Sequence, residues 1–215
     1  RPSIRLASLM DINSVFIFTH DSIYLGEDGP THQPIEHLMS LRLIPNVDVI
    51  RPSNSIEMNH SYRYAFSDSK NPKVLSLTRQ DLDYLDFDVK YEEFLKGGYV
   101  VSDGDDFTIV ASGSELEIAF KIKAALLEYS VRIVSVPILN KLSNMKNEEI
   151  NELLKNKHVF PIELGRSIGW ESYLGRLTKT FSIDTFGESA PIEDLEKNFG
   201  FDIPSITKEI IKYLN

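Results

Sequence analysis

Short apolar runs recur through the first third of the chain, separated by segments with helical patterns. Residues 15–18 read Val-Phe-Ile-Phe, and mainly apolar segments with one polar residue each occupy residues 47–50 and 74–77. A continuous apolar run of this length is typical of a strand buried on both faces of a parallel sheet. The sequence therefore predicts three strands here, the first of them buried on both faces.

Amphipathic segments before and between these runs predict helices. They comprise the tail of a helix at residues 4–10, a helix that starts near Thr31 with Pro34 in its first turn, and a helix capped by Asn54 and Glu57. Strands that alternate with helices are joined by right-handed crossovers. We therefore expect a parallel sheet.

Residues 81–96 differ from both flanking segments, because acidic and aromatic residues crowd together there. We interpret this stretch as a linker between two domains, with aromatic side chains that pack on the surface it crosses. A calcium-binding loop would need a tighter spacing that includes glycine.

A second alternating unit follows the linker. Strands are predicted at residues 99–101, 108–111, 131–136, 159–162 and 180–183, and helices after residues 112–115, at 147–155, at 191–198 and at about 205–214. On the first of these helices, Leu116, Phe120 and Leu127 are expected to share one face. Trp170 and Tyr173 are expected in the core or an interface. The predicted fold class is α/β, with two α/β units.

The polar loop at residues 19–38 carries the richest candidate chemistry. Its titratable side chains include His20, His32, His37, Asp21, Glu27 and Asp28. Glycine tolerates backbone angles that other residues avoid, and proline fixes one angle. The two glycines and two prolines at residues 26–34 therefore indicate a shaped site.

The loop and Arg79 both follow the carboxyl ends of predicted parallel strands. Ligands of open parallel sheets bind beyond these strand ends, so His20, Asp28, His32 and Arg79 are expected within reach of one ligand. Arginine can hold a phosphate or carboxylate with two parallel N–H donors. Histidine exchanges protons near neutral pH. The predicted ligand is an oxygen-rich anion.

Each candidate also has a structural interpretation. Arg79 could pair with a neighbouring acid, and His37 falls inside a predicted helix, at the surface or the edge of the core. Asp21 and Glu27 could cap the loop backbone. The Ser-Gly-Ser-Glu turn at residues 112–115 resembles a phosphate-binding turn, but a plain helix N-cap is favoured.

A metal site in the loop is a further alternative. His20, Asp28 and His32 form a reasonable ligand set. Their spacing fits no familiar metal pattern, so we predict no metal ligands in this chain.

Composition narrows the function classes. The 215 residues are 42% hydrophobic, carry a net charge of −9 and include no cysteine. The acidic balance argues against nonspecific nucleic-acid binding, and the lack of cysteine removes disulfides and thiolate chemistry. The apolar runs are too short to span a bilayer, and no signal-peptide pattern follows Arg1. We expect a cytoplasmic protein that binds neither nucleic acid nor membrane.

Several motifs closely resemble transketolase, the thiamine-diphosphate-dependent sugar enzyme. Residues 26–34 read Gly-Glu-Asp-Gly-Pro-Thr-His-Gln-Pro, residues 77–80 Leu-Thr-Arg-Gln, and residues 185–191 Thr-Phe-Gly-Glu-Ser-Ala-Pro. The first motif is specific, and the others support it in the same order. Tyr24 departs from the family, which usually has glycine there.

The resemblance implies a fold and residue roles. Residues 1–80 would be a partial pyrimidine-binding domain, residues 81–96 a linker, and residues 97–215 a transketolase C-terminal domain. The substrate-binding residues would be His20 and Arg79 near the phosphate, Asp28 at a donor hydroxyl and His32, also the catalytic residue, near the donor carbonyl. The parent enzyme would be a homodimer that moves a two-carbon ketol unit between sugar phosphates.

The resemblance also implies what this chain lacks. In transketolases, thiamine diphosphate and its Mg or Ca ion bind in regions that correspond to sequence upstream of Arg1. We therefore expect no cofactor-binding residues in this chain. We expect a C-terminal portion that is inactive alone. The alternatives are a deoxyxylulose-phosphate synthase, a dehydrogenase beta subunit, or a non-catalytic assembly or regulatory module. Residues 33–34 and 77–80 favour transketolase over the related enzymes.

Overall fold

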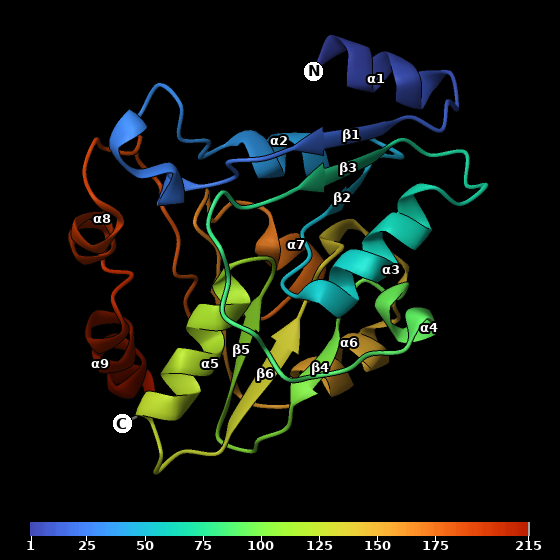
Figure 1. The fold of residues 1–215 in the computed structure, drawn as a ribbon. Helices are drawn as coiled ribbons and strands as arrows, with labels where there is room; N and C mark the ends of the chain where they lie inside the picture. Colours follow the sequence, from blue (N-terminus) through green and yellow to red (C-terminus); the bar gives the residue numbers. More distant parts are fainter. Residues whose placement is uncertain (215) are drawn as a thin grey trace.

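Two open β-sheets, each from one half of the chain, organise the computed structural model, which describes residues 1–214 (Figure 1). The first sheet has the order β1-β3-β2 and is wholly parallel. Its strands are β1 (Val15–Phe18), β2 (Asp48–Ile50) and β3 (Lys73–Ser76). The predicted parallel sheet is confirmed.

Helices precede and connect the strands of the first sheet. They are α1 (Pro2–Leu9), the 3-10 helix η1 (Ile23–Asp28), α2 (His37–Arg42) and α3 (Ser55–Ala65). The predicted cap of α3 is present, because the Asn54 side chain accepts a hydrogen bond from the Glu57 amide at 2.9 Å.

The helix predicted from Thr31 begins only at His37. The amides of His32 and Gln33 both donate to the Gly29 carbonyl, at 3.0 and 3.1 Å, and so close a tight turn. Pro34 has no amide hydrogen to extend a helix backwards. The turn therefore delays the helix by six residues from its predicted start near Thr31.

Strand β1 is not buried on both faces, contrary to the prediction. It lies at the edge of the sheet and pairs only with β3. Ile17 and Phe18 remain 48% and 43% exposed, whereas central β3 is buried along its whole length. An apolar run alone does not distinguish an edge strand from a central one.

The acidic and aromatic segment crosses between the two sheets and includes a short helix, α4 (Tyr91–Phe94). Phe94 is fully buried and Phe87 stacks on Phe120 with 6.3 Å between ring centres. Tyr84, at 77% exposure, does not pack as expected. The domain boundaries at residues 80 and 96 stay a prediction.

The second sheet is mixed and has the order β4-β6-β5-β7. Its strands are β4 (Tyr99–Ser102), β5 (Phe107–Ala111), β6 (Val131–Ser135) and β7 (His158–Ile162). β4 is antiparallel to β6, and the other pairs are parallel. Figure 1 shows the carboxyl ends of β5 and β6 directed toward the first sheet.

Helices flank this second sheet. They are α5 (Glu115–Ala125), the 3-10 helix η2 (Leu139–Asn144), α6 (Asn147–Leu154), α7 (Trp170–Leu174), α8 (Ile192–Phe199) and α9 (Ile203–Leu214). Trp170 is fully buried in the core, as expected. No helix within residues 1–214 combines the length and apolar character that a membrane crossing requires.

Two predictions for this half are wrong. Residues 180–183 form no strand, and only an isolated bridge joins Phe181 to Ile162. Leu127 lies beyond the end of α5 and is 88% exposed, so it does not share the buried face of Leu116. The helix ends at Ala125, before the apolar pattern does.

Candidate functional site

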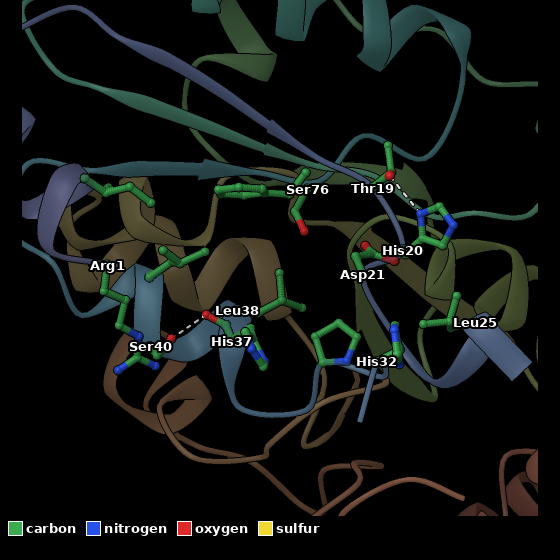
Figure 2. Close-up of a pocket in the computed structure, with 14 residues that line it drawn as sticks. Arg1, Thr19, His20, Asp21, Leu25, His32, His37, Leu38, Ser40 and Ser76 are labelled. Atoms are coloured by element: carbon green, nitrogen blue, oxygen red, sulfur yellow. Dashed lines mark hydrogen bonds between the residues drawn. The ribbon is translucent and has the colours of Figure 1, made fainter. Parts of the chain in front are cut away.

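A pocket of about 390 Å³ opens beyond the carboxyl end of β1. Figure 2 shows His20, Asp21 and His32 on one side of it and His37 and Ser40 on the other. Apolar side chains line much of the rest of the wall. A mostly apolar pocket with a few convergent polar groups is the usual form of a small-molecule site.

The two predicted histidines share one arrangement. The Thr19 hydroxyl lies 2.7 Å from His20 Nδ1, and the Thr31 hydroxyl lies 2.9 Å from His32 Nδ1. Within residues 1–214 neither ring has another hydrogen-bond partner, which leaves Nε2 available to a ligand. His20 also has a positive φ of 65°, a strained conformation for a residue with a side chain.

Asp28 and Arg79 lie outside the lining of this pocket. Asp28 ends η1, Arg79 follows β3 by three residues, and both are exposed. No acidic side chain in the described part of the chain pairs with Arg79, so the ion pair that was the structural alternative for this residue does not form there. The structure brings His20 and His32 to one pocket, and the four-residue site stays a prediction.

Asp21 does not cap the loop backbone as predicted. Its carboxylate accepts hydrogen bonds from Arg51, 3.0 Å from Nε and 2.8 Å from Nη2. Arg51 also donates to both oxygens of Glu115, each at 3.0 Å. A buried carboxylate needs a compensating charge, and the strand-end arginine after β2 supplies it.

The buried cluster of Asp21, Arg51, Glu115 and Glu163 joins the loop to the second half of the chain. Burial acts to lower the pKa of Arg51, but the three carboxylates outweigh it and raise that pKa above its ordinary value. Burial raises the pKa of Glu115, and Arg51 opposes this shift. Arg51 follows a buried strand as Arg79 does. The same signal, an arginine just beyond a strand end, could therefore have identified Arg51 from the sequence.

Glu163 extends this cluster toward α2 and α7. Its carboxylate accepts hydrogen bonds from Arg42 Nη1 and from Trp170 Nε1, both at 2.9 Å. Arg51 Nη1 lies 3.6 Å from the same carboxylate. Two arginines from the first half therefore meet one acid from the second.

The turn at residues 112–115 cradles a guanidinium. Ser114 occupies the N-cap position of α5 without a capping hydrogen bond, which contradicts the predicted cap. The Ser112 hydroxyl instead accepts from Arg51 Nη1 at 3.1 Å. Gly113 has a φ of 58°, and an added Cβ would lie 3.2 Å from Arg51 Cζ. The turn is shaped around Arg51.

Tyr24 points into the protein. Its side chain is buried and its hydroxyl donates to Glu196 of α8 at 2.7 Å. Burial, followed by the hydrogen bond and charge of Glu196, raises the pKa of Tyr24 above its ordinary range. The Tyr24 carbonyl accepts from Gln80 at 2.7 Å. The residue that departs from the family pattern is therefore part of the packed interior, where it joins the loop to α8.

Two family models match consecutive parts of the chain. Residues 1–83 match the pyrimidine binding domain of transketolase, and residues 97–202 match the transketolase-like C-terminal domain. The transketolase of Bacillus subtilis (strain 168) is 39% identical over an alignment that covers 100% of this chain and 34% of that protein.

Solved structures agree with these matches. The transketolase from Leishmania mexicana has a TM-score of 0.91 and 34% identity, and covers 99% of this chain and 32% of its own. A transketolase from Pichia stipitis in complex with sedoheptulose-7-phosphate has a TM-score of 0.90, 32% identity and the same two coverages. The chain spans about a third of the length of these relatives. It belongs to the transketolase family and corresponds to the end of the pyrimidine-binding domain together with the C-terminal domain.

Proposed function

We propose that this chain supplies substrate-binding residues of a transketolase that moves a two-carbon ketol unit between sugar phosphates. The observation that carries the proposal is the convergence of His20 and His32 on one pocket beyond β1. The similar Pichia stipitis transketolase, in complex with a sugar phosphate, supports the ligand class. The proposed units are residues 1–80, a linker at 81–96 and residues 97–215.

Each residue has a proposed role. Arg79 binds the phosphate, with His20 beside it, because a guanidinium matches the geometry of phosphate oxygens. Asp28 accepts a hydrogen bond from a donor hydroxyl. His32 lies near the donor carbonyl and moves protons, since a neutral imidazole exchanges protons near neutral pH.

Thiamine diphosphate would supply the carbanion chemistry of the reaction. The described residues do not fit the metal part of such a site, because no group of three or more His, Asp or Glu side chains in residues 1–214 could hold a metal ion. The proposed share of this chain is to bind and orient the sugar phosphate. The proposed parent is a cytoplasmic homodimer.

His32→Ala in the full-length protein tests this function. Loss of a proton-transfer group lowers kcat/KM by about 10²- to 10⁴-fold. The measurement is steady-state turnover with a ketose phosphate donor and an aldose phosphate acceptor. His158→Ala, which alters a half-buried histidine of β7 outside the pocket, is the matched control and should retain most activity. Unchanged turnover in His32→Ala would favour a non-catalytic assembly module.

A further inference from the structure

The turn that carries Asp28 and His32 is held from the second half of the chain. Gln33 is only 4% exposed, and its Nε2 donates to the Gly26 carbonyl at 2.8 Å and to the Glu188 carbonyl at 2.9 Å. The side chain of Gln33 thus joins the start of the turn to the loop at residues 185–190.

Gly187 makes this approach sterically possible. A Cβ added at this position would lie 1.7 Å from Gln33 Oε1 and 2.8 Å from Gln33 Cδ. Real Cβ atoms do not approach other heavy atoms this closely, so any side chain at this position would displace Gln33. The φ of Gly187 is not positive, and the requirement for glycine is therefore one of space.

Ser189 provides a second attachment. Its hydroxyl donates to the Glu27 carbonyl, on the residue before Asp28. Its Cβ lies 3.1 Å from the position that a Cβ on Gly29 would occupy, on the residue after Asp28. The residue before Asp28 is therefore hydrogen-bonded to Ser189, and a side chain on the residue after it would meet the same serine.

We infer that the loop at residues 185–190 is a positioning element of the candidate site. Gln33, Gly187 and Ser189, here called the loop clamp, fix the turn at residues 26–33 and so set the places of Asp28 and His32. The inference rests on the proposed function of those two residues. It gives the C-terminal half a role in the site without contact to the ligand.

Hydrogen exchange of this chain tests the clamp without any need for activity. Gly187→Ala and Gln33→Ala should each speed amide exchange in residues 26–33 at least tenfold, with little change elsewhere. Ser189→Ala should act in the same direction and more weakly, since it removes a single hydrogen bond. Thr185→Ala, at an exposed position of the same loop, is the matched control and should leave exchange unchanged.

The double variant Gln33→Ala with Gly187→Ala separates a specific clamp from general loosening. If Gly187 acts through Gln33, the double variant should exchange no faster than the faster single variant. The clamp would be overturned if the accelerations of the two single variants multiplied in the double variant. It would also be overturned if amide exchange rose throughout the chain, or if exchange in residues 26–33 did not change.

Kinetics of the full-length protein test positioning. A displacement of about 1 Å in a substrate-orienting group can cost 10²-fold, so Gly187→Ala should lower kcat/KM for the donor by roughly 10- to 100-fold at an unchanged unfolding midpoint. Normal kinetics in Gly187→Ala, despite a loosened turn, would overturn the positioning role if His32→Ala is impaired. Normal kinetics in both variants would instead overturn the proposed function.

Discussion

At the residue scale, Arg51 has the largest structural consequence. Its side chain is fully buried and forms ion pairs with Asp21 and Glu115, which are themselves almost completely buried. Removal of one partner from a buried ion pair leaves an uncompensated charge, which costs more than the pair contributes. Since Asp21 follows His20 directly, this cluster also anchors the wall of the candidate pocket.

Arg51→Met should therefore be strongly destabilising. We expect the free energy of unfolding to fall by about 3–5 kcal/mol, as measured by urea denaturation near neutral pH. Arg5→Met, which alters an exposed arginine, is the control, and its free energy of unfolding should stay close to that of the parent. A loss below about 1 kcal/mol for Arg51→Met would contradict a dominant role of the cluster.

The pH dependence of this deficit has a definite sign. Without Arg51, burial raises the pKa of Glu115 further, so the folded state binds a proton at a higher pH than the unfolded state does. A protein with such a carboxyl has a larger free energy of unfolding as the pH falls toward the raised pKa. The difference in free energy of unfolding between Arg51→Met and the parent should therefore become smaller as the pH falls from neutral.

At the scale of elements, β1 is the exposed edge of the first sheet. Its unpaired side offers backbone donors and acceptors next to the exposed side chains of Ile17 and Phe18. The neighbouring helix α1 also exposes Leu6 and Leu9, which are 55% and 66% accessible. An apolar strand edge of this kind is a template for pairing with another chain.

Ile17→Lys should weaken association of the isolated chain. A charge on an edge strand opposes pairing with a second strand. We expect the mean mass from light scattering to rise less with protein concentration than for the parent. Tyr84→Lys adds the same charge at an exposed position of the linker, and equal behaviour of the two variants would exclude the β1 edge as the cause.

At the scale of the whole molecule, buried polar contacts join the two halves. Glu57 of α3 is completely buried and accepts hydrogen bonds from the Ser53 amide at 2.7 Å and from Ser135 of β6 at 2.6 Å. The Tyr99 hydroxyl of β4 donates to the same carboxylate. Together with the Arg51 cluster and the loop clamp, Glu57 connects the first sheet with the second.

The isolated chain should show no transketolase turnover. Its described residues lack a group that could hold the metal ion of the cofactor. We expect activity at background level with thiamine diphosphate, Mg²⁺ and pentose phosphates, in a coupled assay where a full-length transketolase is the positive control. Measurable turnover by the chain would contradict the view that it supplies only the substrate-binding share.

Local chemistry accounts for the features that sequence predicted. The apolar runs located all seven strands of the described residues, together with an eighth at residues 180–183 that does not form. The Asn54 cap located the start of α3, and residues 26–34 located the turn with His32. β4 and the other strands of the second unit followed from the same periodicity. These features depend on neighbouring residues, so a sequence pattern carries them.

Only the tertiary structure decided which residues become partners. Arg51 and Glu115 are 64 positions apart, and Gln33 and Glu188 are 155 apart. Periodicity says that a residue is buried but not what faces it, nor that β1 lies at an edge. By itself, the sequence determined the α/β elements, the family motifs and the candidate histidines. The packing of the two halves determined how Asp21, Gln33 and Tyr24 hold that loop, because those contacts exist only when distant segments meet.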